Sequence, residues 1–324
     1  MADLWLQFLL TLDATCRVAT PLILCAMAGI FSEKSGVIDI SLEGKMLMSA
    51  FAAAAVASLT SSALAGLVVA IGISVLLGLL HGLASVTLRG NQVISGLAIN
   101  ILASGLTVTV GIAIFQQGGQ TPSLARDERF RPIELPLAEQ IGHIPVVGTI
   151  YKEVISGHNI LVWTAFAAVI VTAIVLTKTR FGLRLRAVGE KPEALDSAGV
   201  SVAKTRYLAL IIAGVLCGIA GAYLSTAHGS GFVREMTAGK GYIALAAMIF
   251  GKWQPRSALL ACLLFGFLEA VASRLQGVQL PLIGEAPVDL ILALPYLLTV
   301  ILLAGFVGKA MPPRAIGEPY IKER

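Results

Sequence analysis

Charged residues are scarce in this sequence. Asp, Glu, Lys and Arg make up only 13% of the 324 residues, whereas 56% of the residues are hydrophobic. A soluble domain is about a quarter charged because its surface must be polar. The apolar run at 63–88 also exceeds the roughly 20 residues that a membrane-spanning helix needs. We therefore predict an all-α fold, a polytopic transmembrane helix bundle formed by 1–324 as a single domain.

The signatures of several other protein classes are missing. The four cysteines form no CxxC pair and lie in apolar segments, so they are interpreted as small buried hydrophobic residues, and the four histidines lack ligand spacing. We therefore expect no metal site. Basic residues are not interleaved with aromatic ones, which argues against nucleic-acid binding. The sequence shows no nucleophile–base pair of the kind that an enzyme would need, so we do not expect an enzyme. The Walker pattern G-x-x-x-x-G-K-[ST] is absent, so this chain is expected to hold no cofactor, and any ATP would bind a separate subunit.

The apolar runs predict eight to ten spans, with broken or re-entrant helices among them. The spans are expected near 9–31, 37–60, 63–88, 92–115, 159–178, 207–227, 238–253, 256–274 and 289–308. The segment at 238–253 is short and glycine-rich, which favours a re-entrant helix. Small residues at four-residue spacing, such as Gly214 and Gly218, indicate close helix packing.

Two long connections set the expected orientation. Residues 179–206 carry six Lys or Arg against three acids, and the excess of positive charge places them in the cytoplasm together with the C-terminal tail. One span separates them from 116–158, which is therefore expected to be an external loop. The prediction is a multi-pass protein in contact with membrane lipid.

The stretch "SGVIDISLEGKMLMSAF" (35–51) places charges at membrane depth. From residue 46 to the expected break at Ser61–Ser62 a helix would be only about 22 Å long, short of a hydrocarbon core of about 30 Å. Residues 36–45 must then enter the membrane, either as a helix with Asp39 and Glu43 on one face or as an unwound segment leading into a half-helix. Carboxylates there should face protein or water, with Lys45 or Lys34 as possible partners.

A similar stretch, "MTAGKGYIALAAM" (236–248), enters from the opposite side in this topology. Such a pair of discontinuous helices is typical of an inverted repeat whose helix ends line a transport site. Asn100 also suits a role as an interhelical hydrogen-bond partner. For Asp39 and Glu43, the competing interpretation is a solvated acid pair in an interfacial loop. Glu269 is expected to form a local pair with Arg274. The candidate translocation-path or gate residues are Asp39, Ser41, Glu43, Lys45, Asn91, Asn100 and Lys240.

The basic connection contains "RLRAVGEKPEALDSAGVSVAKTRY". Pro192 can begin a short helix, and Gly199 can end it. The order Glu-Ala-Leu, three residues, Gly resembles the E-A-A-x-x-x-G coupling loop of ATP-binding-cassette import permeases. Leu195 stands where the third alanine is usual, and the downstream Ile-x-Leu-Pro element is missing. The resemblance assigns ATPase coupling to 179–206, through Arg186, Lys191, Glu193, Ala194, Leu195 and Gly199.

Three stretches narrow the resemblance. "GVIDISLEGKMLMSAFAA", "RAVGEKPEALDSAGV" and "MTAGKGYIALAAMIFGKWQP" resemble, in order, segments of the branched-chain amino acid/ribose-type permease family, and specifically of its nucleoside-uptake members. Asp39 replaces a common asparagine and Ser41 a common glycine, which bears on substrate identity more than on transport.

The resemblance implies the membrane permease subunit of an ATP-driven importer in the cytoplasmic (inner) membrane of a prokaryote. It also implies an ABC ATPase subunit, a second permease, identical or homologous, and an external substrate-binding lipoprotein. The expected solute is a nucleoside or a related small polar molecule, moved by alternating access. Two alternatives stay open: an importer of simple sugars, or an ion-coupled secondary transporter that uses Asp39 and Glu43.

Overall fold

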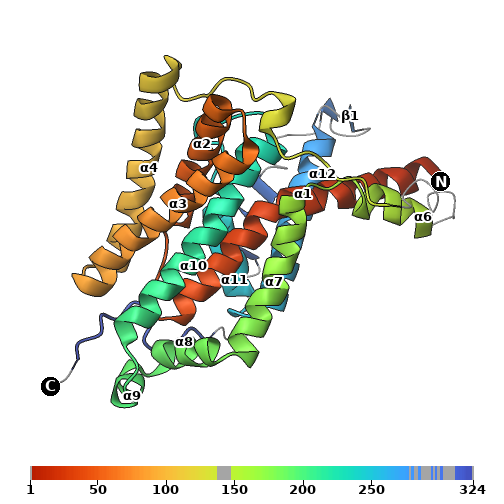
Figure 1. Ribbon diagram of the computed structural model, residues 1–324. Helices are drawn as coiled ribbons and strands as arrows, with labels where there is room; N and C mark the ends of the chain where they lie inside the picture. The colour runs from red at the N-terminus through yellow and green to blue at the C-terminus, as the bar shows by residue number, and fades with distance from the viewer. Residues whose placement is uncertain are drawn as a thin grey trace.

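The computed structural model describes residues 2–136, 147–276, 279–280, 284–285, 293–294, 296–297, 300–301 and 311–322. Within these ranges the protein is a bundle of helices with one small antiparallel sheet, which pairs the two-residue strands β1 (Gln279–Leu280) and β2 (Gly284–Glu285) (Figure 1). Seven of the described helical segments are long and apolar enough to cross a membrane, which confirms the predicted polytopic all-α fold. Most of the span predicted at 289–308 lies outside the described residues.

The helix order follows the predicted spans closely. The long helices, with the π-helical turns η1 and η4 extending two of them, are α1 (Ala2–Lys34), α2 (Leu42–Thr60), α3 (Ala63–Gly82) with η1 (Leu83–Thr87), α4 (Gln92–Phe115), α7 (Ile160–Lys178), α10 (Val202–Tyr223) with η4 (Leu224–His228), and α12 (Pro255–Leu275). The shorter elements are η2 (Arg126–Glu128), α6 (Val147–Ile150), η3 (Tyr151–Ile155), α8 (Arg180–Glu190), α9 (Pro192–Ser197) and α11 (Lys240–Phe250).

Local sequence explains where several helices begin and end. Ser61 takes a left-handed conformation after α2, and the Ser62 side chain caps α3 by accepting from the Ala65 N–H, so the break expected there is confirmed. Asn91 and Asn159 cap α4 and α7 in the same way. These side-chain oxygens satisfy N–H groups that have no partner within the first helical turn.

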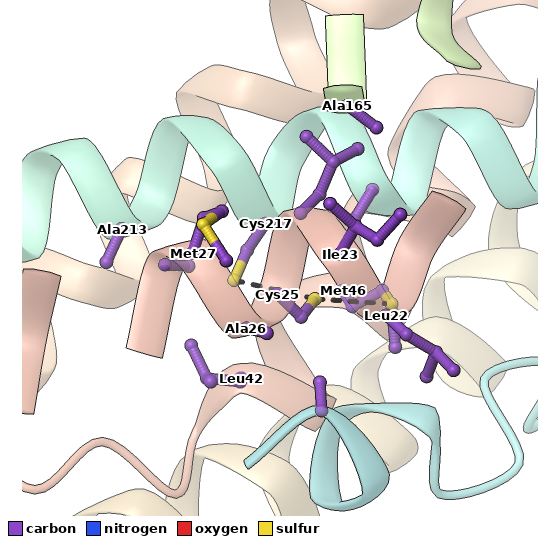
Figure 2. Close-up of a cluster of buried hydrophobic side chains, with 14 of the residues drawn as sticks. Leu22, Ile23, Cys25, Ala26, Met27, Leu42, Met46, Ala165, Ala213 and Cys217 are labelled. Atoms are coloured by element: carbon purple, nitrogen blue, oxygen red, sulfur yellow. Dashed lines mark hydrogen bonds between the residues drawn. The ribbon is translucent and has the colours of Figure 1, made fainter. Parts of the chain in front are cut away.

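The centre of the bundle is α1, whose residues from Leu22 to Ile30 are nearly all inaccessible to solvent. Figure 2 shows this core, where the thiol of Cys25 lies 3.6 Å from the Met46 sulfur and 3.9 Å from the Cys217 sulfur. All four cysteines are free, and Cys16 alone is half-buried. Their interpretation as small hydrophobic residues is thus confirmed for Cys25, Cys217 and Cys262.

Glycine allows α3 and α10 to pack closely. A Cβ on Gly214 would lie 2.8 Å from the Val75 Cα, and a Cβ on Gly218 would lie 2.6 Å from the Ile71 Cα. Real Cβ atoms do not come this close to backbone, so alanine at either position would push the helices apart. The predicted packing role of this small-residue spacing is confirmed.

The two long connections lie at opposite ends of the bundle (Figure 1). One end carries α8, α9 and residues 311–322, and is called the α9 end here. The other carries the α2–α3 turn and the connection after α4, and is called the far end. The Ser61 hydroxyl donates to Glu128 at the far end, whereas Thr87 and Tyr207 share a hydrogen bond toward the α9 end.

Candidate functional site

An unwound segment, residues 35–41, rises from the α9 end into the bundle beside α4. Ile38 N–H donates to the Gln92 side chain at 2.6 Å, and Gly44 N–H, in the first turn of α2, donates to Asn100 Oδ1 at 2.8 Å. Between them, a Cβ on Gly96 would lie 3.1 Å from the Ser41 nitrogen. Gln92 and Asn100 are two helical turns apart, which is about 12 Å along α4. Of the two arrangements the sequence left open, the structure has the unwound segment, and it leads into a helix whose first turn lies about 12 Å along the apolar α4.

Asp39 is held within this segment by a buried ion pair. Lys45 Nζ lies 2.5 Å from Asp39 Oδ2, and the Ser41 hydroxyl donates to Oδ1 at 2.5 Å. The side chains of Asp39 and Lys45 are 0% exposed. Desolvating two charges is costly, so the pair depends on its close geometry and on the additional hydrogen bond. Of the partners considered for Asp39, Lys45 is the one observed, and Asp39, Ser41 and Lys45 all face protein in this conformation.

His81 fixes the same segment from α3. Its imidazole is buried, with Nε2 donating to the Ile38 carbonyl at 2.9 Å and Nδ1 lying 3.0 Å from the Ser95 hydroxyl. The unpaired backbone of an extended segment is thereby satisfied in an apolar environment.

A second half-helix meets this one from the other side. Residues 229–239 descend from the far end and lead into α11, which has only 11 residues and runs toward the α9 end. The carboxylate of Glu43 joins the two helices, since Oε1 accepts from the Gly239 N–H at 2.8 Å and Oε2 from the Gly241 N–H at 2.6 Å. A carboxylate at the N-terminus of a helix also interacts favourably with the helix dipole.

The two glycines allow this contact. Gly239 has φ = +81°, a left-handed value that suits glycine, and a Cβ on Gly241 would lie 2.6 Å from the Glu43 nitrogen. The two segments noted in the sequence therefore enter from opposite ends and meet at their helix N-termini, which is the geometry expected of discontinuous transporter helices.

Asn100 binds both halves of this arrangement. Its side chain accepts from Gly44 and donates to the Ile40 carbonyl at 3.0 Å and to the Tyr242 hydroxyl at 2.8 Å. Asn91 lies two turns away, exposed at the α9 end, where it caps α4. Asn91 is thus not brought together with the other candidates.

Lys240, at the first position of α11, pairs with α12. Its ammonium group forms an ion pair with Glu269 of α12, and Arg274 instead donates to the Gln7 carbonyl at 3.1 Å. The local Glu269–Arg274 pair expected from sequence is therefore wrong, because the α11–α12 packing brings Lys240 to Glu269 across the fold.

At the α9 end, α9 presents a short exposed helix. Pro192 begins it, and Gly199 follows it with φ = +76° and an N–H that donates to the Asp196 carbonyl. Leu195 is buried against Val188 and Val202. The exposed candidates are Arg186, Lys191, Glu193, Ala194 and Gly199. Leucine where the resembling loops carry alanine therefore anchors α9 to the bundle and leaves its outer face free.

Residues 311–322 connect α9 to the segment at 35–41. The Gly317 N–H donates to the Gly36 carbonyl at 3.0 Å, and the Tyr320 hydroxyl donates to Asp196 at 3.0 Å. Buried Arg206, near the start of α10, donates to the carbonyls of Ser35 and Glu318 at 3.2 and 3.1 Å. Sequence analysis missed Arg206 as a structural link, because its partners are backbone groups without a sequence signature.

Comparison with known proteins identifies the family of this chain. Residues 11–303 match the family described as "Branched-chain amino acid transport system / permease component". The chain is 38% identical over 315 residues to the guanosine ABC transporter permease protein NupQ of Bacillus subtilis, covering 95% of each chain. It is 39% identical to the nucleoside ABC transporter permease protein NupC of Lactococcus lactis, covering 94% of this chain and 95% of that one. It is also 35% identical to the putative glucose ABC transporter permease protein TsgC13 of Haloferax volcanii, covering 85% and 80%.

These matches and the seven apolar helices define an integral membrane protein of the transport permease class. The chain belongs to the family of branched-chain amino acid transport system permease components.

Proposed function

We propose that this chain is the membrane permease subunit of an ATP-driven importer of nucleosides in the inner membrane of a prokaryote. The observation that carries the proposal is the full-length similarity to two permeases named for guanosine and nucleosides. Discontinuous helices that meet within the membrane support a transport role. The proposed partners are an ABC ATPase, a second permease and an external substrate-binding lipoprotein, with ATP bound by the ATPase subunit.

The exposed α9 helix is proposed to dock on the ATPase from the cytoplasmic side. That orientation, with 179–206 and the tail in the cytoplasm and 116–158 outside, rests on the excess of basic residues around α8 and α9. Movement of α9 would reach the membrane interior by two routes. One runs through Asp196 and Tyr320 to Gly317 and Gly36, and the other through Arg206 to Ser35.

The segment at 35–41 would then act as the gate element. It carries Asp39 and leads directly to Glu43, which contacts the N-terminus of α11. A shift of this segment would separate or rejoin the two half-helices, giving alternating access through a rearrangement between two packed states. Asp39, Ser41, Glu43, Lys45, Asn100 and Lys240 are the residues proposed to change partners, and Asn91 is proposed to hold the start of α4.

Reconstitution of the four-component system in proteoliposomes tests this function. We expect ATP-dependent uptake of radiolabelled guanosine, abolished by Glu193→Lys or by Gly199→Asp while the permease still inserts and assembles. Glu134→Lys is the matched control, because Glu134 is an exposed acid in the connection after α4, far from α9. Normal transport by both α9 variants would contradict the coupling role.

Two further arms separate the alternatives. Guanosine uptake by this chain alone, driven by an ion gradient without ATPase, would favour a secondary transporter using Asp39 and Glu43. Uptake of glucose in place of nucleosides would favour a sugar importer, as the similarity to a putative glucose permease suggests.

A further inference from the structure

Glu235 carries an exposed carboxylate in the middle of the membrane-spanning region. The Ser104 hydroxyl of α4 donates to Glu235 Oε1 at 2.5 Å. Ser104 is the thirteenth of the 24 residues of α4, so it lies about 18 Å from the start of a helix about 36 Å long. The carboxylate is therefore near the midpoint of this helix, and Glu235 is exposed on the surface of the chain.

A carboxylate at this depth does not face lipid stably, because its charge would lose its hydration. Among the described residues no Lys, Arg or His forms an ion pair with Glu235. By contrast, Leu102 of α4, two residues before Ser104 and so on the opposite side of the helix, is 41% exposed and suits a lipid-facing surface. The side of α4 that carries Ser104 must therefore meet water or polar groups.

The backbone around Glu235 is held in an unusual conformation. Glu235 has φ = +55° and Ala238 has φ = +46°, both in the left-handed region that glycine and asparagine favour. Hydrogen bonds between Thr121 and Phe232 fix the start of this segment. Such strained positions gather at binding sites, where the surrounding structure enforces them.

Aromatic and amide groups lie one helical turn away. Asn100, four residues before Ser104, donates to the hydroxyl of Tyr242, whose side chain is 42% exposed. The hydroxyl of Tyr296 lies 3.8 Å from the position that a Cβ on Gly239 would take. Half-buried Asn100 and Ser104 and exposed Glu235 and Tyr242 thus form a wall that offers a carboxylate acceptor beside an aromatic ring.

We propose that this wall lines a water-filled translocation path and binds the nucleoside, with Glu235 accepting paired donors and Tyr242 stacking on the base. The proposal rests on the proposed function, which supplies the substrate class. A nucleoside presents adjacent donors on its ribose 2′,3′-diol or on the base edge, and a flat ring that an aromatic side chain can cover. Glu235, Ser104 and Tyr242 would therefore be specificity-determining residues.

Thiol labelling tests whether the wall faces water. Glu235→Cys and the control Leu102→Cys are assembled separately in the full complex and treated with a membrane-impermeant cationic thiosulfonate reagent. The wild-type chain gives the background from its four cysteines. We expect Glu235→Cys to react at least tenfold faster than Leu102→Cys and to be protected by guanosine. Equal, slow reaction of both variants would overturn the proposal. Fast reaction without protection, in a complex whose wild type transports guanosine, would overturn the binding role.

Transport by Glu235→Gln tests specificity. We expect the KM for guanosine to rise about tenfold while the maximal rate and the amount of assembled permease are kept. Comparison with 2′,3′-dideoxyguanosine, which lacks the diol, and with purine riboside, which lacks the donors on the base, identifies which donors Glu235 accepts. An equal change in KM for all three nucleosides would show that Glu235 recognises neither the ribose diol nor the donors on the base. Absence of nucleoside transport by the wild-type complex would instead count against the proposed function, and the labelling rates would still report whether Glu235 faces water.

Discussion

Glu43 and Gly241 are far apart in the sequence, yet the Gly241 N–H donates to the Glu43 carboxylate at 2.6 Å. With the second bond from Gly239, this contact joins the first turn of α2 to the N-terminus of α11. The Glu43 side chain thus joins two half-helices that enter from opposite ends.

Replacing Glu43 with glutamine is expected to weaken this junction. The amide keeps one acceptor oxygen but turns an NH2 group toward the other N–H, and the favourable charge at the α11 N-terminus is lost. Hydrogen bonds to charged groups contribute about 1.5–3 kcal/mol. We expect a lower melting temperature of the purified permease and strongly reduced transport. Glu190→Gln, at an exposed position on α8, is the control, and an unchanged melting temperature for Glu43→Gln would contradict the prediction.

Gly241→Ala is expected to separate the half-helices. The added methyl carbon would lie 2.6 Å from the Glu43 nitrogen, so α2 and α11 would have to move apart. Overpacking of this kind costs about 1–3 kcal/mol. Gly105→Ala on α4 is the matched control because nothing lies within 4 Å of its Cβ position. Gly241→Ala should lower both the melting temperature and the rate of guanosine uptake, and Gly105→Ala should change neither. Equal behaviour of the two variants would count against close packing.

The Asp39–Lys45 pair is expected to show strong coupling in a double-mutant cycle. Asp39→Leu or Lys45→Met alone leaves one buried charge without its partner, which costs about 3–5 kcal/mol. The double variant removes both charges, so its melting temperature should recover most of the loss. Its transport should stay impaired if the pair belongs to the gate. If the melting temperature of the double variant fell by the sum of the two single losses, the charges would not interact.

Much of the fold could be predicted from sequence because each membrane span is a long apolar run of residues. The break at Ser61–Ser62, the start of α9 at Pro192 and its end at Gly199 also follow from local chemistry. The short α11 could be expected from its glycines and its length.

The contacts of the site were harder to foresee. Glu43 binds backbone N–H groups, which every residue but proline carries, so no pattern could identify Gly239 and Gly241 as its partners. Lys240 meets Glu269 only because α11 packs on α12. Glu235 stands one residue before the stretch noted as a repeat, and its sole sequence signal is an acid close to apolar segments.

The contact between Gly317 and Gly36 has a consequence for biosynthesis. Residues 311–322 leave the ribosome long after α1, α2 and α4 have been made, and yet they supply the partners of the Gly36 and Gly189 carbonyls and of Arg206. The corner between α1 and α2 therefore cannot reach its final packing during insertion. The permease acquires the native anchoring of its unwound segment only as a late maturation step, after translation has passed residue 317.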